Sequence, residues 1–213
     1  MTHPSRRSFL ATGGMAAAGG IAAAAQPGEG AANELAVDPK PLFEISPHLY
    51  MQFMEPLGAT DSSVEAAWDY RINDWREDFV AVTSELAPQT MRWGGLFSRY
   101  YRWREGIGAA ERRPHMRNYV WGGHESNRVG THEFLAFCRR VGAGPLVCVN
   151  FQSDGFLTYK NKPEGGRSAG PAEAADWVSY CNDPDHPERA ENGSRAPMPV
   201  KLWQLGNETS YGK

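Results

Sequence analysis

Five polar or charged residues lie at or just after short apolar segments of the chain: Glu55, Arg92, Asn150, Asn207 and Glu208. A carboxyl group at a buried strand end, such as Glu208, is desolvated, which raises its pKa and lets it hold a proton near neutral pH. Asn207 offers amide groups for sugar hydroxyls, and Arg92 would keep a second carboxylate ionised. A protonated acid, an ionised carboxylate and hydroxyl-binding amides together form the constellation of a glycosidase.

A turn is the alternative interpretation of the Asn207–Glu208 pair, because such residues also cap helices. For this dipeptide alone, the turn is favoured. Four expected strands, however, each place a polar group at their carboxyl end, and that edge carries the active site in α/β barrels. The repeated position therefore favours a site over four unrelated turns.

The hydrophobic pattern predicts strands that alternate with helices. Residues 72–86 have apolar side chains at helical spacing, Thr131 is placed to cap a helix that runs to Val141, and residues 145–150 form a continuous apolar run. The other expected elements are strands at 51–54, 89–93 and 200–205, a helix at 171–180, and loops at 96–127 and 151–170. This order indicates parallel strands joined by crossover helices.

The expected fold class is α/β, as the N-terminal half of a (β/α)8 TIM barrel over residues 49–213, truncated after about strand four. A complete barrel needs eight strand–helix units and usually about 250 residues, whereas this length holds only about four units. An open half barrel would expose edge strands and part of its core, so we expect the natural protein to continue. A small doubly wound domain is the alternative, although no phosphate-binding G-x-G-x-x-G follows a strand.

The first 35 residues have the features of a twin-arginine export signal and a tether. Arg6 and Arg7 precede a weakly apolar stretch, Ala11–Ala25, that ends in small residues suited to cleavage. Its glycines and its lack of charge argue against a helix of the mature protein, and it is short for a membrane span. We therefore expect a periplasmic or extracellular protein without stable membrane insertion after cleavage.

The composition of the 213-residue chain excludes some partners. The formal net charge is −3 and no basic run occurs, so no nucleic-acid partner is expected. Cys138, Cys148 and Cys181 lack metal-type spacing and are expected to be buried thiols, and no pair of the six histidines has ligand spacing. Neither a metal nor another cofactor is expected, and the oligomeric state is left open.

Five segments resemble, in the same order, the retaining α-L-arabinofuranosidases of glycoside hydrolase family 51, whose clan shares a (β/α)8 barrel. The segments are ISPHLYMQFMEPLG (45–58), MRWGGLFSRYYRWREGIGAAERRP (91–114), VWGGHESNRVGTHEFLAFCRRVGAGPLVCVN (120–150), DWVSYCN (176–182) and VKLWQLGNE (200–208). Each motif alone is weak, but five motifs in the same order, in a match that spans residues 42–208, are strong.

The resemblance implies that Glu208 is the general acid/base and that Asn207 binds the sugar 2-hydroxyl. It implies that Glu55 contacts a substrate hydroxyl and that Trp121 forms a wall of the sugar pocket. Arg92 would lie close to the nucleophile, and Asn150 is expected among the substrate-binding residues. The family's nucleophile is a second Glu on the seventh strand, so we expect the chain alone to be inactive.

Two departures from the family pattern bear on the substrate. The family's Pro-Gly-Gly-Asn reads Trp93-Gly94-Gly95-Leu96 here, so a sugar-binding Asn is replaced by Leu, and the loop at 151–170 is expanded. Residues 36–48 correspond to a strand that joins a β-sandwich in the family.

The implied function is hydrolysis of terminal α-L-arabinofuranosyl residues from plant polysaccharides. One alternative is another glycosidase of the clan, such as a β-xylosidase or an endoglucanase-like enzyme. The other is a non-catalytic carbohydrate-binding protein.

Overall fold

The computed structural model describes residues 35–58, 63–151 and 169–211. One compact unit spans Ile45–Lys213, and the preceding unit contributes residues 35–44 to the described part. Residues 35–46 form neither helix nor strand, and the short 3₁₀ helix η2 (Pro47–Leu49) follows. The expectation that residues 36–48 join a β-sandwich as a strand stays a prediction. The expected signal falls on residues outside the described part.

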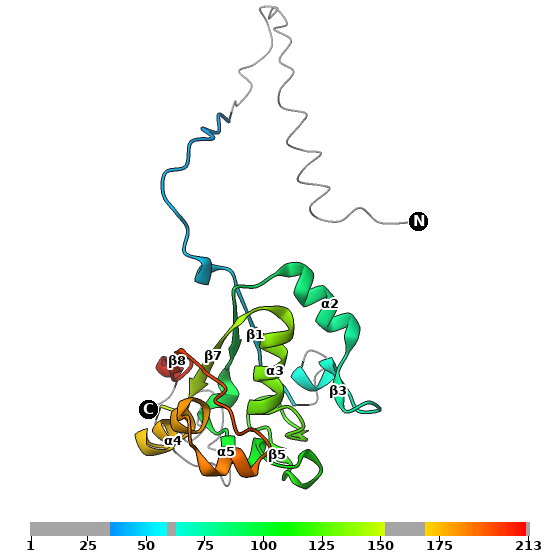
Figure 1. Ribbon diagram of the computed structural model, residues 1–213. Helices are drawn as coiled ribbons and strands as arrows, with labels where there is room; N and C mark the ends of the chain where they lie inside the picture. The colour runs from blue at the N-terminus through cyan, green and yellow to red at the C-terminus, as the bar shows by residue number, and fades with distance from the viewer. Residues whose placement is uncertain (1–34, 59–62, 152–168, 212–213) are drawn as a thin grey trace, which may run out of the picture. The chain divides into compact units, whose positions relative to one another are not determined.

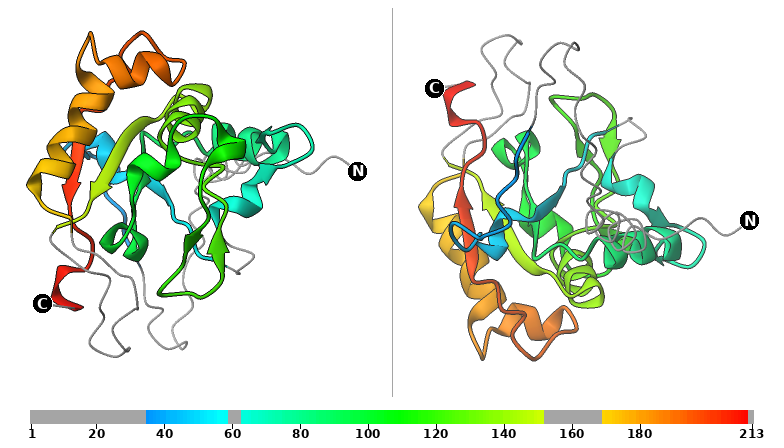
Figure 2. Two further views of the ribbon diagram at one scale, coloured as in Figure 1. Left: turned by 90° about the horizontal axis from the view of Figure 1, so that it is seen from below. Right: turned by 90° about the horizontal axis from the view of Figure 1, so that it is seen from above.

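Four parallel strands form the main sheet, in the order in which they occur along the chain (Figures 1 and 2). They are β1 (Met51–Met54), β4 (Thr90–Trp93), β7 (Gly144–Val149) and β8 (Leu202–Leu205). In the register across the sheet, Phe53 pairs with Arg92, and Arg92 with Leu146. The expected α/β class with a parallel sheet is therefore confirmed, and all four strands end at the same edge.

Helices and short elements connect the strands. The helices are α2 (Glu77–Leu86), α3 (Thr131–Val141), α4 (Pro171–Asn182) and α5 (Pro187–Glu191). Two hairpins pair β2 (Trp68–Asp69) with β3 (Asp74–Trp75) and β5 (Met116–Arg117) with β6 (His124–Glu125). The 3₁₀ helices are η3 (Val64–Ala67), η4 (Leu96–Arg99), η5 (Trp103–Gly106), η6 (Ala110–Arg112) and η7 (Thr209–Tyr211).

The helix expected over residues 72–86 is shorter than predicted. Asp74 and Trp75 pair with β2, so α2 begins only at Glu77. Trp75 is buried, but its ring packs from the hairpin against Phe137 of α3, with centroids 4.6 Å apart. The helical spacing was misleading because a buried hairpin residue occupied a position in the same apolar pattern.

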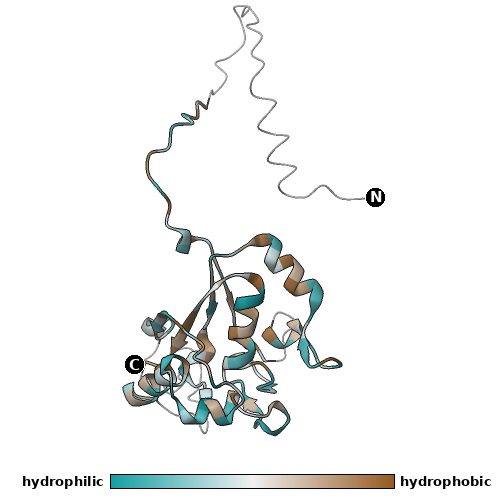
Figure 3. Cartoon of the chain, viewed as in Figure 1, coloured by the Kyte–Doolittle hydropathy of each residue, from teal (hydrophilic) through white to brown (hydrophobic). Residues whose placement is uncertain are grey.

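One face of the sheet packs against helices and forms the core. Met91, Trp93 and Val147 are each 1% exposed, and the Trp93 ring contacts Phe134 of α3 with centroids 5.4 Å apart. The strands of the main sheet are accordingly mostly hydrophobic, whereas the helices carry both hydrophobic and hydrophilic residues (Figure 3). Trp93 and the buried Trp103 belong to this core and do not form a binding platform. The three cysteines are buried and free, which confirms the prediction of buried thiols.

The opposite face of the sheet has a different character. Phe53 is 60% exposed, and Arg92 and Gln204 are only partly buried. Because residues alternate between the two faces of a strand, Arg92 projects away from the side on which Met91 and Trp93 pack. Polar side chains of the sheet are thereby kept accessible beside the edge where the strands end.

The start of α3 corrects one expectation. Thr131 is the first helical residue instead of the cap, and the backbone N–H of Gly130 donates to Glu133 Oε2 at 2.9 Å. The Thr131 hydroxyl accepts a hydrogen bond from Trp177 Nε1 at 3.1 Å, so it ties α3 to α4. The side chain that closes the helix start is Glu133.

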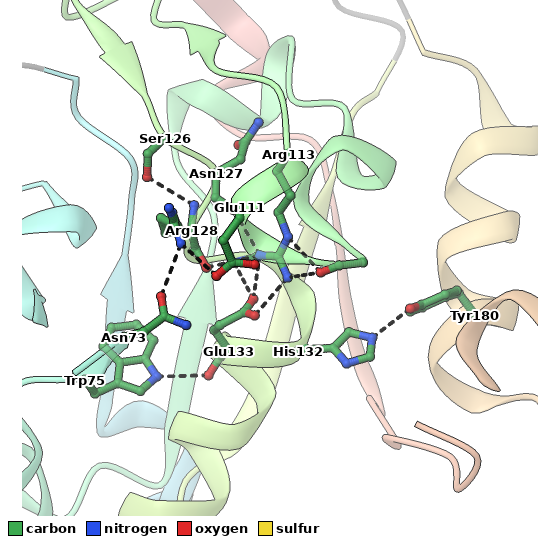
Figure 4. Close-up of polar contacts among 12 residues, drawn as sticks. Asn73, Trp75, Glu111, Arg113, Ser126, Asn127, Arg128, His132, Glu133 and Tyr180 are labelled. Carbon is green, nitrogen blue, oxygen red and sulfur yellow. Dashed lines mark hydrogen bonds and ion pairs between the residues drawn. The ribbon is translucent and has the colours of Figure 1, made fainter. Parts of the chain in front are cut away.

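A buried ion pair anchors the long segment between β4 and α3 (Figure 4). The Arg113 guanidinium donates to both carboxylate oxygens of Glu133, at 2.9 and 3.0 Å, and the two side chains are 4% and 17% exposed. Arg113 also donates to the backbone carbonyls of Gly108, Asn127 and Arg128. A segment expected as an irregular loop is thus fixed to the first turn of a helix.

We expect Arg113→Ala to lower the free energy of unfolding by about 3 kcal/mol, because it leaves the Glu133 carboxylate without its buried partner. Urea denaturation followed by circular dichroism measures the change. Arg112→Ala is the matched control, since Arg112 is the exposed last residue of η6, directly before Arg113. Equal effects of the two substitutions would show that the ion pair does not anchor the segment.

In the described ranges, no helix has the length and apolar character needed to cross a membrane.

Candidate functional site

The carboxyl ends of the parallel strands border a cavity of about 310 Å³. Its lining residues are Phe53, Glu55, Arg92, Gly95, Leu96, Trp121, Asn207 and Glu208. Five of the six residues singled out from the sequence therefore line one cavity. The exception is Asn150.

Glu55 follows β1 and lies directly against the backbone of Gly95. A Cβ atom at Gly95 would lie 2.0 Å from the carboxyl carbon of Glu55, and Gly95 has a φ of +136°. Glycine is needed here both for its conformation and for this close approach. The backbone N–H of Phe97 donates to Glu55 Oε1 at 3.2 Å, which fixes the carboxyl group at the rim.

The environment of Glu55 raises the pKa of its carboxyl group. Burial raises its pKa, and the negative charge of Glu208 acts in the same direction. The N–H groups of Phe97 and Leu96 and the charge of Arg92 oppose this effect without cancelling it. The Glu55 carboxyl group is thus harder to ionise than an exposed one, and its oxygens lie where a hydroxyl group in the cavity could bind.

Arg92 is held on the open face of the sheet by two neighbours. Its Nη1 donates to Gln204 Oε1 at 3.2 Å, and its guanidinium carbon lies 5.0 Å from the centroid of the Phe53 ring. Gln204 in turn donates to the carbonyl of Gly206 at 2.8 Å. Sequence reasoning missed Gln204; its position two residues before Gly206, on the same face as Arg92, was the available signal.

Glu208 and Asn207 follow β8 after a tight turn. Gly206 has a φ of +74°, and its N–H donates to the carbonyl of Val149 at 3.0 Å. Asn207 is 7% exposed, and Glu208 has a φ of +47° with its carbonyl accepting from Arg99 Nη1 at 3.1 Å. The turn therefore presents both side chains to the cavity.

The burial expected for Glu208 is not found in this structure. Its side chain is exposed, and of the two carboxyl groups that line the cavity it is Glu55 whose pKa burial raises. The alternative of a turn has support as well, because η7 begins directly after Glu208.

Asn150 does not reach the cavity. Its Nδ2 donates to the carbonyl of Arg99 at 2.6 Å, and it lines a separate small cavity with Ser98 and Cys148. Since Arg99 also binds the Glu208 carbonyl, Asn150 supports the site from behind rather than lining it.

Trp121 and Leu96 form the apolar walls. Trp121 is 45% exposed and Leu96 is 7% exposed. The backbone N–H of Trp121 donates to Asn118 Oδ1 at 2.7 Å, so its position depends on a buried residue that the sequence did not single out.

Among the residues that the structure describes, no three His, Cys, Asp or Glu side chains are grouped to hold a metal ion. The cavity is lined by carboxyl, amide, guanidinium and aromatic groups, which bind hydroxylated ligands.

Comparison with known proteins assigns the family. Residues 82–213, more than half of the chain, match the family model described as the alpha-L-arabinofuranosidase 1 domain. The chain belongs to this family. Resemblance to the α-L-arabinofuranosidases of glycoside hydrolase family 51, expected from five short segments, is thereby confirmed.

Curated α-L-arabinofuranosidases match over most of the chain. Probable alpha-L-arabinofuranosidase C of Aspergillus niger is 34% identical over 179 residues, which cover 79% of this chain and 32% of that protein. The exo-alpha-(1->6)-L-arabinofuranosidase of Bifidobacterium longum is 31% identical over 195 residues, covering 86% and 34%. The chain thus spans about a third of the length of these relatives.

Solved α-L-arabinofuranosidase structures share the fold. The enzyme from Thermotoga maritima, in its arabinose complex, aligns with a TM-score of 0.62 at 30% identity, over 77% of this chain and 33% of that one. The family 51 enzyme from Bifidobacterium longum aligns with a TM-score of 0.67 at 27% identity, over 83% and 34%.

We expect the stability of the chain to depend on pH through Glu55. Because burial raises its folded-state pKa, its stabilising contribution is complete below the ordinary value of 4.5 and is lost as pH rises through the folded-state value. Wild type should therefore lose stability relative to Glu55→Gln as pH rises. Urea midpoints of both proteins between about pH 4 and 8 measure this difference.

Glu85→Gln controls for the loss of one negative charge, since Glu85 is an exposed residue of α2. A difference between wild type and Glu55→Gln that stays constant with pH would contradict the assignment of a raised pKa to Glu55.

Proposed function

We propose that the protein to which these residues belong is a retaining α-L-arabinofuranosidase that removes terminal α-L-arabinofuranosyl groups from plant polysaccharides. The observation that carries the proposal is the convergence of Glu55, Arg92, Trp121, Asn207 and Glu208 on one cavity. Membership of the α-L-arabinofuranosidase family supports the reaction class.

Glu208 is the proposed general acid/base. In the first step it would protonate the leaving glycosidic oxygen while a nucleophilic carboxylate attacks the anomeric carbon, and in the second step it would deprotonate the water that releases arabinose. Its exposed side chain at the cavity is accessible to water, as the second step requires. Asn207 would hold the 2-hydroxyl group, and Trp121 would pack against the sugar.

Glu55 is a poor candidate for the nucleophile, although its carboxyl group lines the same cavity. Its carboxyl group is packed against the backbone of Gly95, where a Cβ atom would lie 2.0 Å from the carboxyl carbon. Its oxygens also accept from the backbone N–H groups of η4. A hydroxyl contact suits Glu55 better, and the nucleophile is proposed to be a Glu on a seventh strand, about 5 Å from the acid/base.

This mechanism needs a closed barrel, and we propose that β1, β4, β7 and β8 are its first four strands. Their parallel order along the chain supports this architecture. So does the alignment with family 51 structures over about a third of their length.

A glycosidase of different substrate preference is the second candidate, and Leu96 is the observation that favours it. An apolar side chain lines the cavity where the family has a sugar-binding Asn. A panel of nitrophenyl glycosides on the complete protein separates the two: faster cleavage of the xyloside or glucoside than of the arabinofuranoside would overturn the proposed substrate.

We expect Glu208→Gln in the complete protein to lower kcat on arabinoxylan about 10³-fold, because proton transfer to the leaving oxygen is lost. The loss should be much smaller for a dinitrophenyl arabinoside, whose leaving group needs no proton, and azide should restore turnover of that substrate. Initial rates with both substrates measure the contrast.

Glu191→Gln, an exposed substitution on α5, is the control for Glu208→Gln. Equal losses on both substrates would refute the acid/base role. Carbohydrate binding without any turnover by the unsubstituted protein, left unchanged by Glu208→Gln, would instead support a non-catalytic binding protein.

We also propose export by the twin-arginine route to the periplasm or the medium, supported by Arg6 and Arg7 before the weakly apolar Ala11–Ala25. Arg6→Lys with Arg7→Lys should leave the protein uncleaved in the cytoplasm, because the route requires the arginine pair. Immunoblots of cell fractions measure this result, with Arg112→Lys as the control. Cleavage and export of the Lys-Lys variant would argue against this route.

A further inference from the structure

Asn118 is a buried amide whose polar atoms are all engaged. It is 2% exposed, and its Oδ1 accepts from the Tyr100 hydroxyl at 3.0 Å and from the backbone N–H groups of Val120 and Trp121 at 3.1 and 2.7 Å. Its Nδ2 donates to the carbonyl of Pro56 at 3.2 Å and to Glu125 Oε1 at 2.9 Å. One side chain therefore joins three separate parts of the chain.

Each of these parts carries a wall of the cavity. Pro56 directly follows Glu55, and Tyr100 directly follows η4, which begins with Leu96. The third part is the turn that carries Trp121, the aromatic wall. Asn118 itself does not line the cavity.

Glu125 supports Asn118 from β6. It is 2% exposed, and besides Asn118 Nδ2 its Oε1 accepts from the backbone N–H of Gly58. Gly58 and the Trp121 turn are closely packed, since a Cβ atom at Gly58 would lie 1.9 Å from the Gly122 carbonyl oxygen. The segment after β1 and the Trp121 turn cannot shift independently while this network is intact.

We propose that Asn118 is a positioning residue that fixes Trp121 relative to Glu55, and that Glu125 holds Asn118 in the orientation that does so. It acts through the backbone of the Trp121 turn and does not contact the substrate. The consequence for substrate recognition rests on the proposed function of the cavity: a displaced Trp121 should weaken sugar binding more than it slows the chemical step.

Substitutions can exchange the donor and the acceptor of the Asn118–Glu125 contact. Asn118→Asp keeps the acceptor oxygen but removes the donor and sets one carboxyl group against another. Glu125→Gln keeps an oxygen at the position that accepts both hydrogen bonds. In the double variant a Gln amide can donate to the Asp carboxylate, so much of the contact is restored.

Trp121 gives the first readout, on the 213-residue chain. It is the exposed one among the seven tryptophans, because five others are buried and Trp203 is half-buried. Acrylamide quenching of the Trp fluorescence, referenced to Trp121→Phe, reports the exposure of this ring. Hydrogen exchange reports the amides of Val120, Trp121 and Gly58, which the network holds.

The expected result is at least tenfold faster exchange at these amides in Asn118→Asp, with little change in Glu125→Gln. In the double variant the Val120 and Trp121 amides should recover, whereas the Gly58 amide should not, because the Gln NH2 group replaces its acceptor. Asn73→Asp is the matched control, because Asn73 is exposed and its acceptor oxygen, bonded to Arg128, is retained. Tyr100→Phe removes a single donor to Asn118 and should give an intermediate effect, which keeps the test valid if Asn118→Asp does not fold. Unchanged exchange in both Asn118→Asp and Tyr100→Phe would overturn the positioning role.

Kinetics of the complete protein test the consequence for the substrate. Asn118→Asp should raise KM for an arabinofuranoside about tenfold while kcat falls less than threefold, and the double variant should recover. A fall in kcat at unchanged KM would overturn the effect on binding. Inactivity of the unsubstituted protein would count against the proposed function alone, because exchange and quenching decide the positioning role independently.

Discussion

Parallel pairing of four strands is the constraint on which the rest of the structure depends. Since β1, β4, β7 and β8 run in one direction, the residues that follow them meet at one edge even though Glu55 and Glu208 are far apart in the sequence. Helices cover one face of the sheet, so the polar side chains of the other face, such as Arg92, are left to form the site. Fold and chemistry are therefore set by the same arrangement.

The sequence predicted the elements better than their ends. The apolar run at 145–150 gave β7 almost as observed, because a buried parallel strand has an unmistakable pattern. The predicted start of α2 was wrong because Trp75 packs from a hairpin whose strands have two residues each. Strands this short show no alternating hydrophobic pattern in the sequence. The predicted capping role of Thr131 was wrong because its hydroxyl accepts a hydrogen bond from Trp177, which lies on another helix.

Site residues could be predicted where they follow a recognisable element, and not where they depend on contacts between distant segments. Glu55, Arg92 and the Asn207–Glu208 pair lie at strand ends, and strand ends can be read from a sequence. Asn118 lies inside a long irregular segment, and its importance arises from contacts with Pro56 and Tyr100 that only the folded chain brings about. Likewise, whether a strand-end carboxyl group is buried depends on neighbours: Glu55 is pressed against Gly95, whereas Glu208 is exposed.

The close contact between Glu55 and Gly95 also limits how the cavity can be reshaped. At this point the wall is main chain, and its position is set by the backbone between β4 and η4 rather than by any side chain. Attempts to redesign the cavity for a larger or smaller ligand therefore have no freedom at Gly95. Useful variation lies with Leu96 and Trp121, whose side chains can change size while the carboxyl group of Glu55 stays where the backbone holds it.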